Sequence, residues 1–236
     1  MNIWVRPLPR NRNRMCRQNM KRGLFITFEG LDKAGKSTQI GRLRQRLENS
    51  GREVVQLREP GGTPLGEAVR SLVMEFKGGV CDLAELLLFA ASRAQLVREM
   101  VEPALTAGRI VLCDRFADST MAYQGFARGM DQAVIHRLNA LAVGGCVPDL
   151  TVFLDISVED SFRRLSAVLS RSAAGRDRFE TEGRRFHEQV RAGFLHVAEH
   201  EPQRVVRFDA VQSPEVIEEQ IWQQVLKRLA QREGEK

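Results

Sequence analysis

The sequence predicts an α/β fold in which a five-stranded parallel sheet carries helices on both faces. Five short apolar runs recur along the chain, separated by segments with helical spacing of apolar residues. Near-continuous apolar runs are typical of parallel strands buried on both faces. Two runs end directly in an aspartate, Asp114 and Asp155. Because right-handed crossovers place the carboxyl ends of such strands along one edge, we expect the ligand site there.

The first apolar run, residues 24–28, leads into a phosphate-binding loop. Residues 30–37 match the pattern G-x-x-x-x-G-K-[ST], in which glycines let backbone N–H groups surround phosphate oxygens. Lys36 reaches the terminal phosphates, and the Ser37 hydroxyl can bind Mg²⁺. Apolar spacing over 39–48 predicts the following helix, whose positive end adds to phosphate binding, whereas a purely structural glycine turn is the alternative. We therefore predict the three-layer fold of P-loop NTPases, with ATP-binding residues Gly30, Leu31, Asp32, Lys33, Ala34, Gly35, Lys36, Ser37 and Thr38.

The remaining elements alternate along the chain. The apolar runs predict further strands at residues 52–58, 110–113, 150–154 and 204–208. Helical patterns lie at residues 64–76, 82–106 and 213–232. Glu59-Pro60-Gly61-Gly62 breaks the chain after the second strand, so a loop in a ligand-binding position is expected there.

Residues 170–183 interrupt this pattern with a small, glycine-containing and basic segment. Such a composition suits a mobile lid, and an ordinary solvated loop is the equal alternative. A lid would bring the guanidinium groups of Arg171, Arg176 and Arg178 to the transferring phosphoryl group, where planar bidentate donors are most useful. These arginines are therefore candidate catalytic residues.

The composition predicts one globular domain. Hydrophobic residues make up 43% of the 236 residues and charged residues 28%, which is ordinary for a globular chain. No apolar run approaches the roughly 18 residues of a membrane span, and the N-terminus lacks the apolar core of a signal peptide. The four cysteines form no C-x-x-C pair, which argues against zinc and favours reduced thiols, with Cys113 buried. We expect a cytoplasmic protein without a membrane partner.

The net charge of +6 comes from the N-terminal segment. Residues 1–22 hold seven bases and no acid, which leaves 29 bases against 30 acids from residue 23 onward. The segment also holds two prolines and several asparagines, so we expect a disordered extension before a domain over residues 23–236. It could be a nucleic-acid or membrane-surface arm, or an organelle-targeting segment. A solvated tail, or sequence upstream of a true start at Met15 or Met20, is preferred, so no nucleic-acid partner is expected.

Small-molecule phosphoryl transfer fits the phosphate loop best. The sequence lacks the N-K-x-D motif of guanine recognition and a glycine-rich ABC-type signature. A kinase needs a second pocket for the acceptor, and Phe89 and Arg93, four apart on one helical face, suit it, although core packing is the alternative for Phe89. Arg115 suits an acceptor phosphate, while Asp114 could approach Mg²⁺ through water or cap the turn. Hydroxyl and amide groups crowded into 119–125 could read a base edge or sugar.

Four segments in this order resemble the bacterial thymidylate kinases: the phosphate loop, Arg58-Glu59-Pro60-Gly61-Gly62-Thr63, Asp114-Arg115-Phe116 and Ala122-Tyr123-Gln124-Gly125. The resemblance covers roughly residues 22–230, and the R-E-P-G-G segment is particularly specific. It implies transfer of the γ-phosphoryl group of ATP to dTMP, which gives ADP and dTDP for dTTP synthesis. It also implies Mg²⁺ as cofactor and a homodimer.

The same resemblance implies roles for single side chains. Phe89 would stack on thymine, with Arg93, Thr120 and Gln124 at the base, and Tyr123 would lie near the sugar 2′ position. The acceptor phosphate would bind Arg115, and Asp32 would contact the acceptor sugar or phosphate. The predicted substrate-binding residues are Glu59, Arg70, Phe89, Arg93, Arg115, Ser119, Thr120, Tyr123 and Gln124, and the predicted metal site is Ser37 with Asp114.

Lys33 departs from the family pattern. Many bacterial members have glycine there, and some others have an arginine that serves catalysis while their lid lacks one. Here bases occupy both places, and because lysine lacks the planar fork of arginine we expect a lid arginine to carry the catalytic charge. The predicted catalytic residues are Lys36, Asp32, Arg115, Arg171, Arg176 and Arg178.

Two other functions remain open at this point. Another nucleoside or nucleoside-monophosphate kinase would share the phosphate loop and the D-R pair, although R-E-P-G-G argues against it. An RNA- or DNA-binding ATPase would use the basic extension. It predicts salt-sensitive polynucleotide binding that disappears when residues 1–22 are deleted.

Overall fold

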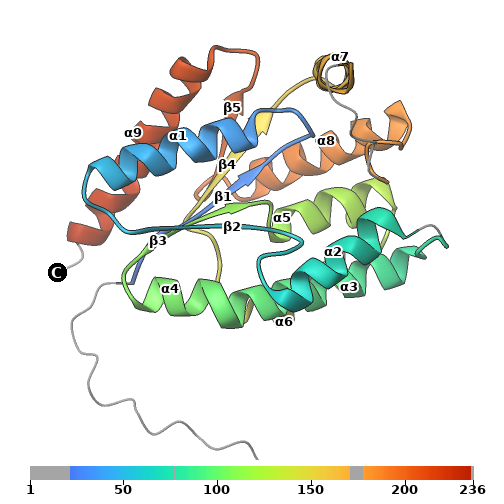
Figure 1. Cartoon of the computed structure of the whole chain (residues 1–236), viewed down its shortest axis with the longest axis horizontal. Helices are drawn as coiled ribbons and strands as arrows, with labels where there is room; N and C mark the ends of the chain where they lie inside the picture. Colours follow the sequence, from blue (N-terminus) through green and yellow to red (C-terminus); the bar gives the residue numbers. More distant parts are fainter. Residues whose placement is uncertain (1–21, 77, 171–177, 235–236) are drawn as a thin grey trace, which may run out of the picture.

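The computed structural model describes residues 22–234 except 77 and 171–177, so the predicted N-terminal extension, Arg171 and Arg176 lie outside the described residues. Its centre is a parallel sheet in the order β2-β3-β1-β4-β5 (Figure 1). The strands are β1 (Phe25–Glu29), β2 (Val54–Arg58), β3 (Ile110–Asp114), β4 (Leu150–Asp155) and β5 (Val205–Asp209). The predicted α/β class and five-stranded parallel sheet are confirmed.

The helices follow the prediction in part. They are α1 (Lys36–Asn49), α2 (Pro64–Glu75), α3 (Asp82–Leu96), η1 (Val97–Val101), α4 (Glu102–Thr106), α5 (Ala117–Thr120), η2 (Met121–Ala127), α6 (Gln132–Val143), α7 (Val158–Leu169), α8 (Arg184–His200) and α9 (Pro214–Gly234). The predicted helix at 82–106 contains the π-helical segment η1, because Pro103 cannot donate the backbone hydrogen bond that a regular helix needs. The segments from α5 to η2 and α6 to α8 were not predicted. None of the described helices is long and apolar enough to cross a bilayer.

Helices cover both faces of the sheet. Helices α1 and α9 lie on one face, and α4 and α6 lie on the other (Figure 1). Alternate residues of the central strands supply the two cores. Ile26 and Leu112 pack in the core that includes α1 and α9, whereas Phe25 and Val111 pack with η1 and α4. Cys113 is buried in this second core, as predicted.

Strand register brings three loops together at the carboxyl edge of the sheet. Phe28 of β1 and Arg58 of β2 both lie opposite Asp114 of β3. The chain then continues the pairing for one residue, since Arg115 N donates to Phe28 O at 3.0 Å and Glu59 N donates to Asp114 O at 2.9 Å. The phosphate loop, the loop after β2 and Arg115 therefore start side by side, as expected for parallel strands.

Candidate active site

The predicted phosphate loop connects β1 to α1. Gly30 and Gly35 have φ angles of 136° and 102°, which L side chains rarely adopt. A Cβ on Gly30 would lie 2.3 Å from the carbonyl oxygen of Leu154, so only glycine fits there. Helix α1 begins at Lys36, which places its positive N-terminal end at the loop. All nine predicted ATP-binding residues lie in this loop and the first turn of α1.

The side chain of Lys36 lies inside the loop. Its Nζ donates to the carbonyl oxygens of Gly30 at 3.2 Å and Leu31 at 3.0 Å. Burial, helped by the charge of Arg115, lowers the pKa of Lys36 to about 8 even though Asp32 raises it. A buried ammonium group held this way is a preorganised positive charge, which suits neutralisation of terminal phosphates.

Helix α7 holds the loop from outside. The Ser161 hydroxyl donates to the carbonyl oxygen of Asp32 at 2.7 Å. Arg164 donates to the carbonyl oxygens of Lys33 at 3.3 Å and Ala210 at 2.8 Å. No sequence signal pointed to these supports, because the contacts join residues about 130 positions apart.

Arg115 joins the phosphate loop to the neighbouring cavity. Its Nη2 lies 2.6 Å from Asp32 Oδ1, and its Nη1 donates to the carbonyl oxygen of Gly30 at 3.0 Å. Burial alone would raise the pKa of Asp32, but Arg115 and Lys36 overcome it and lower the pKa to about 2. Arg115 has a φ of 67°, an uncommon value for a residue with a side chain. Such backbone strain is typical of functional positions.

A cavity of about 110 Å³ opens beside the loop. Its walls include Asp32 and all nine predicted substrate-binding residues: Glu59, Arg70, Phe89, Arg93, Arg115, Ser119, Thr120, Tyr123 and Gln124. They also include four residues that were not predicted: Pro60, Met74, Phe116 and Phe179. The structure thus brings together residues from α2, α3, α5, η2 and four loops. The walls combine three arginines, two carboxylates and several aromatic rings, a mixture that suits a phosphorylated aromatic ligand.

Arg93 is fully engaged by the protein. It is 1% exposed, and its Nε donates to Glu59 Oε2 at 2.8 Å. Its Nη1 donates to Thr120 Oγ1 and Asn139 Oδ1, both at 2.8 Å, and its Nη2 donates to the carbonyl oxygen of Phe116 at 3.1 Å. Every guanidinium nitrogen therefore has a partner, so Arg93 ties the cavity walls together. The resemblance predicted a base contact and did not reveal this supporting role.

Glu59 keeps one oxygen without a partner. Burial raises the pKa of Glu59 to about 7, although the charge of Arg93 opposes the rise. Within the described part of the chain, its Oε1 is buried and accepts no hydrogen bond. The nearby Arg70 Nη1 donates to the carbonyl oxygen of Pro60 at 3.1 Å, which fixes the loop that carries Glu59. A buried, unpaired carboxylate oxygen in a cavity wall is a candidate ligand contact.

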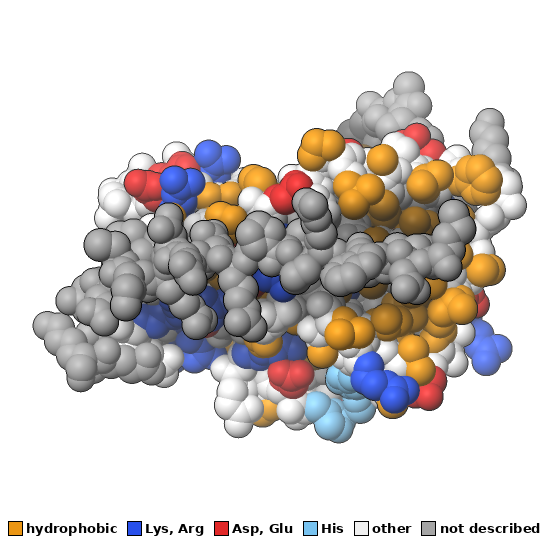
Figure 2. Space-filling model, turned by 90° about the horizontal axis from the view of Figure 1, so that it is seen from below, with side chains coloured by type: hydrophobic (Ala, Val, Ile, Leu, Met, Phe, Trp, Pro, Cys, Tyr) orange, Lys and Arg blue, Asp and Glu red, His pale blue; other side chains and the backbone are white. Residues whose placement is uncertain are grey.

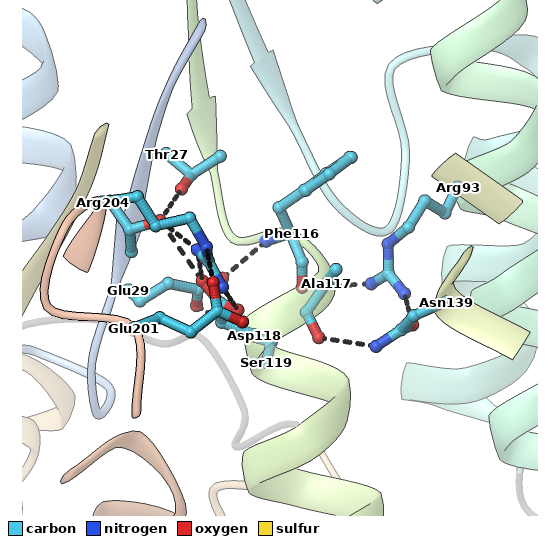
Figure 3. Close-up of polar contacts among 11 residues, drawn as sticks. Thr27, Glu29, Arg93, Phe116, Ala117, Asp118, Ser119, Asn139, Glu201 and Arg204 are labelled. Carbon is cyan, nitrogen blue, oxygen red and sulfur yellow. Dashed lines mark hydrogen bonds and ion pairs between the residues drawn. The ribbon is translucent and has the colours of Figure 1, made fainter. Parts of the chain in front are cut away.

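The turn after β3 is fixed from two sides (Figure 3). Glu29 accepts hydrogen bonds from Phe116 N at 2.7 Å and from Ser119 Oγ at 2.6 Å. On the other side, Arg204 donates to both oxygens of Asp118 at 2.7 Å. Helical winding of the following residues then aims four polar side chains into the cavity: Ser119, Thr120, Tyr123 and Gln124.

Glu29 was missed by the sequence prediction. It is fully buried at the end of β1, and burial together with Asp118 raises its pKa to about 7 against the lowering effect of Arg115. Its position directly before Gly30 was the available signal, because Asp114 and Asp155 end their strands in the same way. Glu29 supports the site without lining the cavity.

Three aromatic rings form the far end of the cavity. Phe89 packs against the core and also lines the cavity, so both interpretations of this residue are compatible with its position. The Phe179 ring lies 6.2 Å from Phe89 and 5.6 Å, edge to face, from Tyr123. The Arg115 guanidinium lies over the Tyr123 ring at 5.2 Å. This end presents the flat apolar surface that an aromatic base needs.

Of the predicted lid at 170–183, the structure describes residue 170 and residues 178–183. Arg178 Nη2 lies 2.8 Å from Glu85 Oε2 and donates to the carbonyl oxygen of Val80 at 3.2 Å. The structure thus places this arginine at the aromatic end of the cavity. Lys33 Nζ lies 3.2 Å from Glu180 Oε1, so the phosphate loop and the predicted lid segment are joined by an ion pair.

The predicted Mg²⁺ ligands lie at the phosphate loop. Ser37 is exposed in the first turn of α1, and Asp114 ends β3 close enough to raise the pKa of Lys36. Proteins usually bind Mg²⁺ through one or two oxygens, with phosphates and water completing the shell. A hydroxyl and a carboxylate beside the loop fit that chemistry. The described residues contain no group of three or more His, Cys, Asp or Glu that could hold a metal without a nucleotide.

Comparison with known proteins gives one consistent result. A family model described as thymidylate kinase matches residues 28–221. The thymidylate kinase of Prosthecochloris aestuarii is 45% identical over 209 residues, which cover 87% of this chain and 94% of the relative. The thymidylate kinase of Trichlorobacter lovleyi is 47% identical, with 88% and 99% covered. A crystal structure of thymidylate kinase from Ehrlichia chaffeensis has a TM-score of 0.69 and 32% identity, and covers 87% of this chain and 99% of the other.

Proposed function

The chain belongs to the thymidylate kinase family, and we propose that its phosphate loop and adjoining cavity hold the two substrates of this reaction. The chain phosphorylates dTMP, and ATP is the donor of the family reaction, which yields ADP and dTDP. The main support for this proposal is that Arg115, which lines the cavity, contacts both Asp32 and Gly30 of the phosphate loop. Its guanidinium group therefore lies between the proposed dTMP site and the proposed ATP site.

We place the thymine base at the aromatic end of the cavity. Phe89 supplies the stacking surface, with Phe179 closing that end. Gln124 and Thr120 lie where an amide and a hydroxyl can reach the base edge, and Tyr123 occupies the wall near the sugar. The dTMP phosphate then points toward Arg115.

Transfer proceeds by in-line attack of a dTMP phosphate oxygen on the γ-phosphorus of ATP. The new bond joins that oxygen to the γ-phosphorus, and the bond to the bridging oxygen of ADP breaks. The attacking phosphate is already largely ionised near neutral pH, so positioning and charge neutralisation supply most of the catalysis. Arg115 orients the acceptor, Lys36 neutralises the donor phosphates, and Asp32 holds Arg115 in place.

Mg²⁺ is the proposed cofactor. When bound with ATP it neutralises phosphate charge and orients the phosphates for transfer. Ser37 and Asp114 are the residues that would hold it, directly or through water.

A lid arginine is the proposed source of further transition-state charge. Lys33 is already paired with Glu180, and Arg178 is paired with Glu85. Because a planar guanidinium binds phosphoryl oxygens in bidentate fashion and lysine does not, Arg171 and Arg176 are the better candidates.

A second copy of this chain is the proposed partner at the face formed by α2, α3 and α6. Figure 2 views the molecule from below Figure 1, where these helices lie, and shows hydrophobic side chains gathered at the right. Exposed side chains on these helices include Leu65, Leu72, Leu83, Leu87 and Leu141. An apolar face of this kind is typical of homodimer interfaces. Light scattering should give the mass of a dimer, and Leu87→Glu with Leu141→Glu should give a monomer; a wild-type monomer would refute the proposal.

The acceptor is tested by ADP release with ATP and Mg²⁺. The rate of ADP release by the wild-type enzyme is measured with dTMP, dUMP, dCMP, UMP and thymidine, each at the same concentration. We expect a clear preference for dTMP, with no turnover of thymidine because it lacks the attacking phosphate. Equal rates with thymidine would instead indicate a nucleoside kinase. The cytoplasmic location and the absence of a nucleic-acid partner stay predictions.

A further inference from the structure

Glu85 is a buried carboxylate that no step above uses. It lies on α3 one helical turn before Phe89, and its side chain is fully buried. It does not line the cavity, whereas its partner Gln124 does. A carboxylate in such a place needs partners that compensate for the loss of water.

Three side chains meet Glu85. Gln124 Nε2 donates to Oε1 at 2.8 Å, and Arg178 Nη2 lies 2.8 Å from Oε2. Arg128 approaches at 3.5 Å and also pairs with Glu182 at 2.6 Å. Two guanidinium groups therefore balance the buried charge, and the amide of Gln124 is the neutral partner.

The contact with Glu85 determines which way the Gln124 amide faces. An ionised carboxylate only accepts hydrogen bonds, so it must meet the NH₂ group of the amide and not its oxygen. Within the described residues nothing donates to Gln124 Oε1, and this oxygen is not sealed off from the cavity. The cavity therefore receives a hydrogen-bond acceptor from Gln124.

Glu85 also holds an aromatic wall. Arg178 directly precedes Phe179, which is 5% exposed and contacts the rings of Phe89 and Tyr123. The ion pair between Arg178 and Glu85 fixes the backbone just before that ring. One carboxylate thus supports both the base edge and the base face of the site.

We propose that Glu85 is a specificity-determining positioning residue, which turns the Gln124 oxygen toward the base and holds Phe179 through Arg178. Thymine and uracil carry a hydrogen on N3 that an acceptor can receive, whereas cytosine presents a lone pair there. An oriented oxygen therefore favours dTMP over dCMP. The inference rests on the proposed placement of dTMP in the cavity.

The test compares kcat/KM for dTMP and dCMP in Glu85→Gln. The new amide can face Gln124 with either its oxygen or its NH₂ group, so the orientation is no longer imposed, and Arg178 loses a charged partner. We expect the dTMP to dCMP ratio of kcat/KM to fall about 3- to 10-fold, as for loss of one hydrogen bond between neutral groups. The loss should appear mainly in the KM for dTMP, with the KM for ATP unchanged.

Glu182→Gln is the matched control. It removes a carboxylate from Arg128 but leaves Gln124 and Arg178 untouched. The substrate ratio should therefore stay at the wild-type value. A fall equal to that of Glu85→Gln would show that charge on Arg128, and not orientation of Gln124, sets the ratio, and would overturn the proposal.

A double-mutant cycle with Gln124→Ala separates this inference from the placement of dTMP. If Glu85 acts through Gln124, Glu85→Gln has little further effect on the ratio in the Gln124→Ala background. Full additivity overturns the inference. If Gln124→Ala alone leaves the ratio unchanged, both the proposed position of the base and the role of Glu85 are contradicted. Thermal unfolding checks that each variant folds, and Glu85→Asp, which keeps the charge but withdraws it from Gln124, should lose part of the ratio even if Glu85→Gln does not fold.

Discussion

The phosphate loop and the acceptor cavity are built in opposite ways. The loop is a run of nine consecutive residues in which backbone N–H groups and one lysine face the ligand site. The cavity gathers side chains from Asp32 to Phe179, carried by several helices and loops. Local chain geometry shapes the first site, and buried polar partners position the second.

This difference determines how each site responds to substitution. In the loop, Gly30 and Lys36 carry the constraints, because one needs its backbone conformation and the other its charge. In the cavity, one side chain can hold several walls, since Arg93 bonds both Glu59 and Thr120. A substitution in the cavity should therefore disturb several contacts at once, whereas a substitution in the loop should act through one group.

The largest effect is expected for Lys36→Ala. Its ammonium group is the preorganised charge of the loop, so kcat should fall by about 1,000-fold. The free energy of unfolding should change little, because two effects oppose each other. The variant loses two hydrogen bonds. It also no longer buries a charge, and the lowered pKa of Lys36 shows that this burial is unfavourable. Steady-state kinetics and thermal unfolding check the two parts.

Lys227→Ala is the control for this experiment, since Lys227 is exposed on α9. It should leave both turnover and the unfolding midpoint unchanged. Near-normal turnover in Lys36→Ala would contradict the role given to the loop. A collapse of the unfolding transition would show that Lys36 serves the fold first.

Arg115→Lys tests the junction of the two sites. Lysine keeps the positive charge but cannot reach Asp32 and Gly30 together with a planar fork. We expect kcat/KM for dTMP to fall about 100-fold through misplacement of the acceptor phosphate. The KM for ATP should change much less. Arg109→Lys, on an exposed ion pair with Glu53, should change neither value; equal losses for both substrates would show that the loop itself depends on Arg115.

The loop could be predicted completely because its signal is contiguous. Glycine positions, Lys36 and the flanking apolar residues all lie within one short stretch, and local conformation follows from them. Strands were found for the same reason, since burial on both faces makes each run apolar. Helix α7 was missed, although the sequence contains a signal for its start. Ser157 is a helix-capping residue, and its Oγ accepts a hydrogen bond from Asp160 N.

The cavity could be predicted only as a set of wall residues, and only through family resemblance. All nine predicted substrate-binding residues line it, but the groups that hold them were missed. Glu29 at least ends a strand, as Asp114 and Asp155 do, whereas Glu85 looks like an ordinary acid in the sequence, because burial of its carboxylate depends on distant partners such as Arg178. Contacts of this kind have no local pattern.

The pH dependence of kcat/KM for ATP tests the loop alone, and its expected effect is smaller than that of the two substitutions above. Because the pKa of Lys36 is lowered to about 8, the ammonium group loses its proton as pH rises through that value. We expect kcat/KM for ATP to fall above pH 8, up to about tenfold per pH unit. Bound phosphates raise the pKa, so kcat at saturating ATP should stay level to higher pH. A kcat/KM that stays level to pH 9.5 would contradict the lowered pKa.

The smallest effect is expected at Lys33, where the loop meets residues beyond the cavity. Its ion pair with Glu180 is partly exposed, and such pairs contribute about 1 kcal/mol at most, so Lys33→Ala should lower kcat no more than about fivefold. Glu180→Gln should have a similar effect, and the double variant should be no worse than either, because both remove one contact. Substitution of Arg171 or Arg176 by alanine should cost more if a lid arginine carries the catalytic charge. A larger kcat loss for Lys33→Ala than for either arginine variant would assign the catalytic charge to the phosphate loop. The loop, and not the lid, would then both bind ATP and stabilise the transition state.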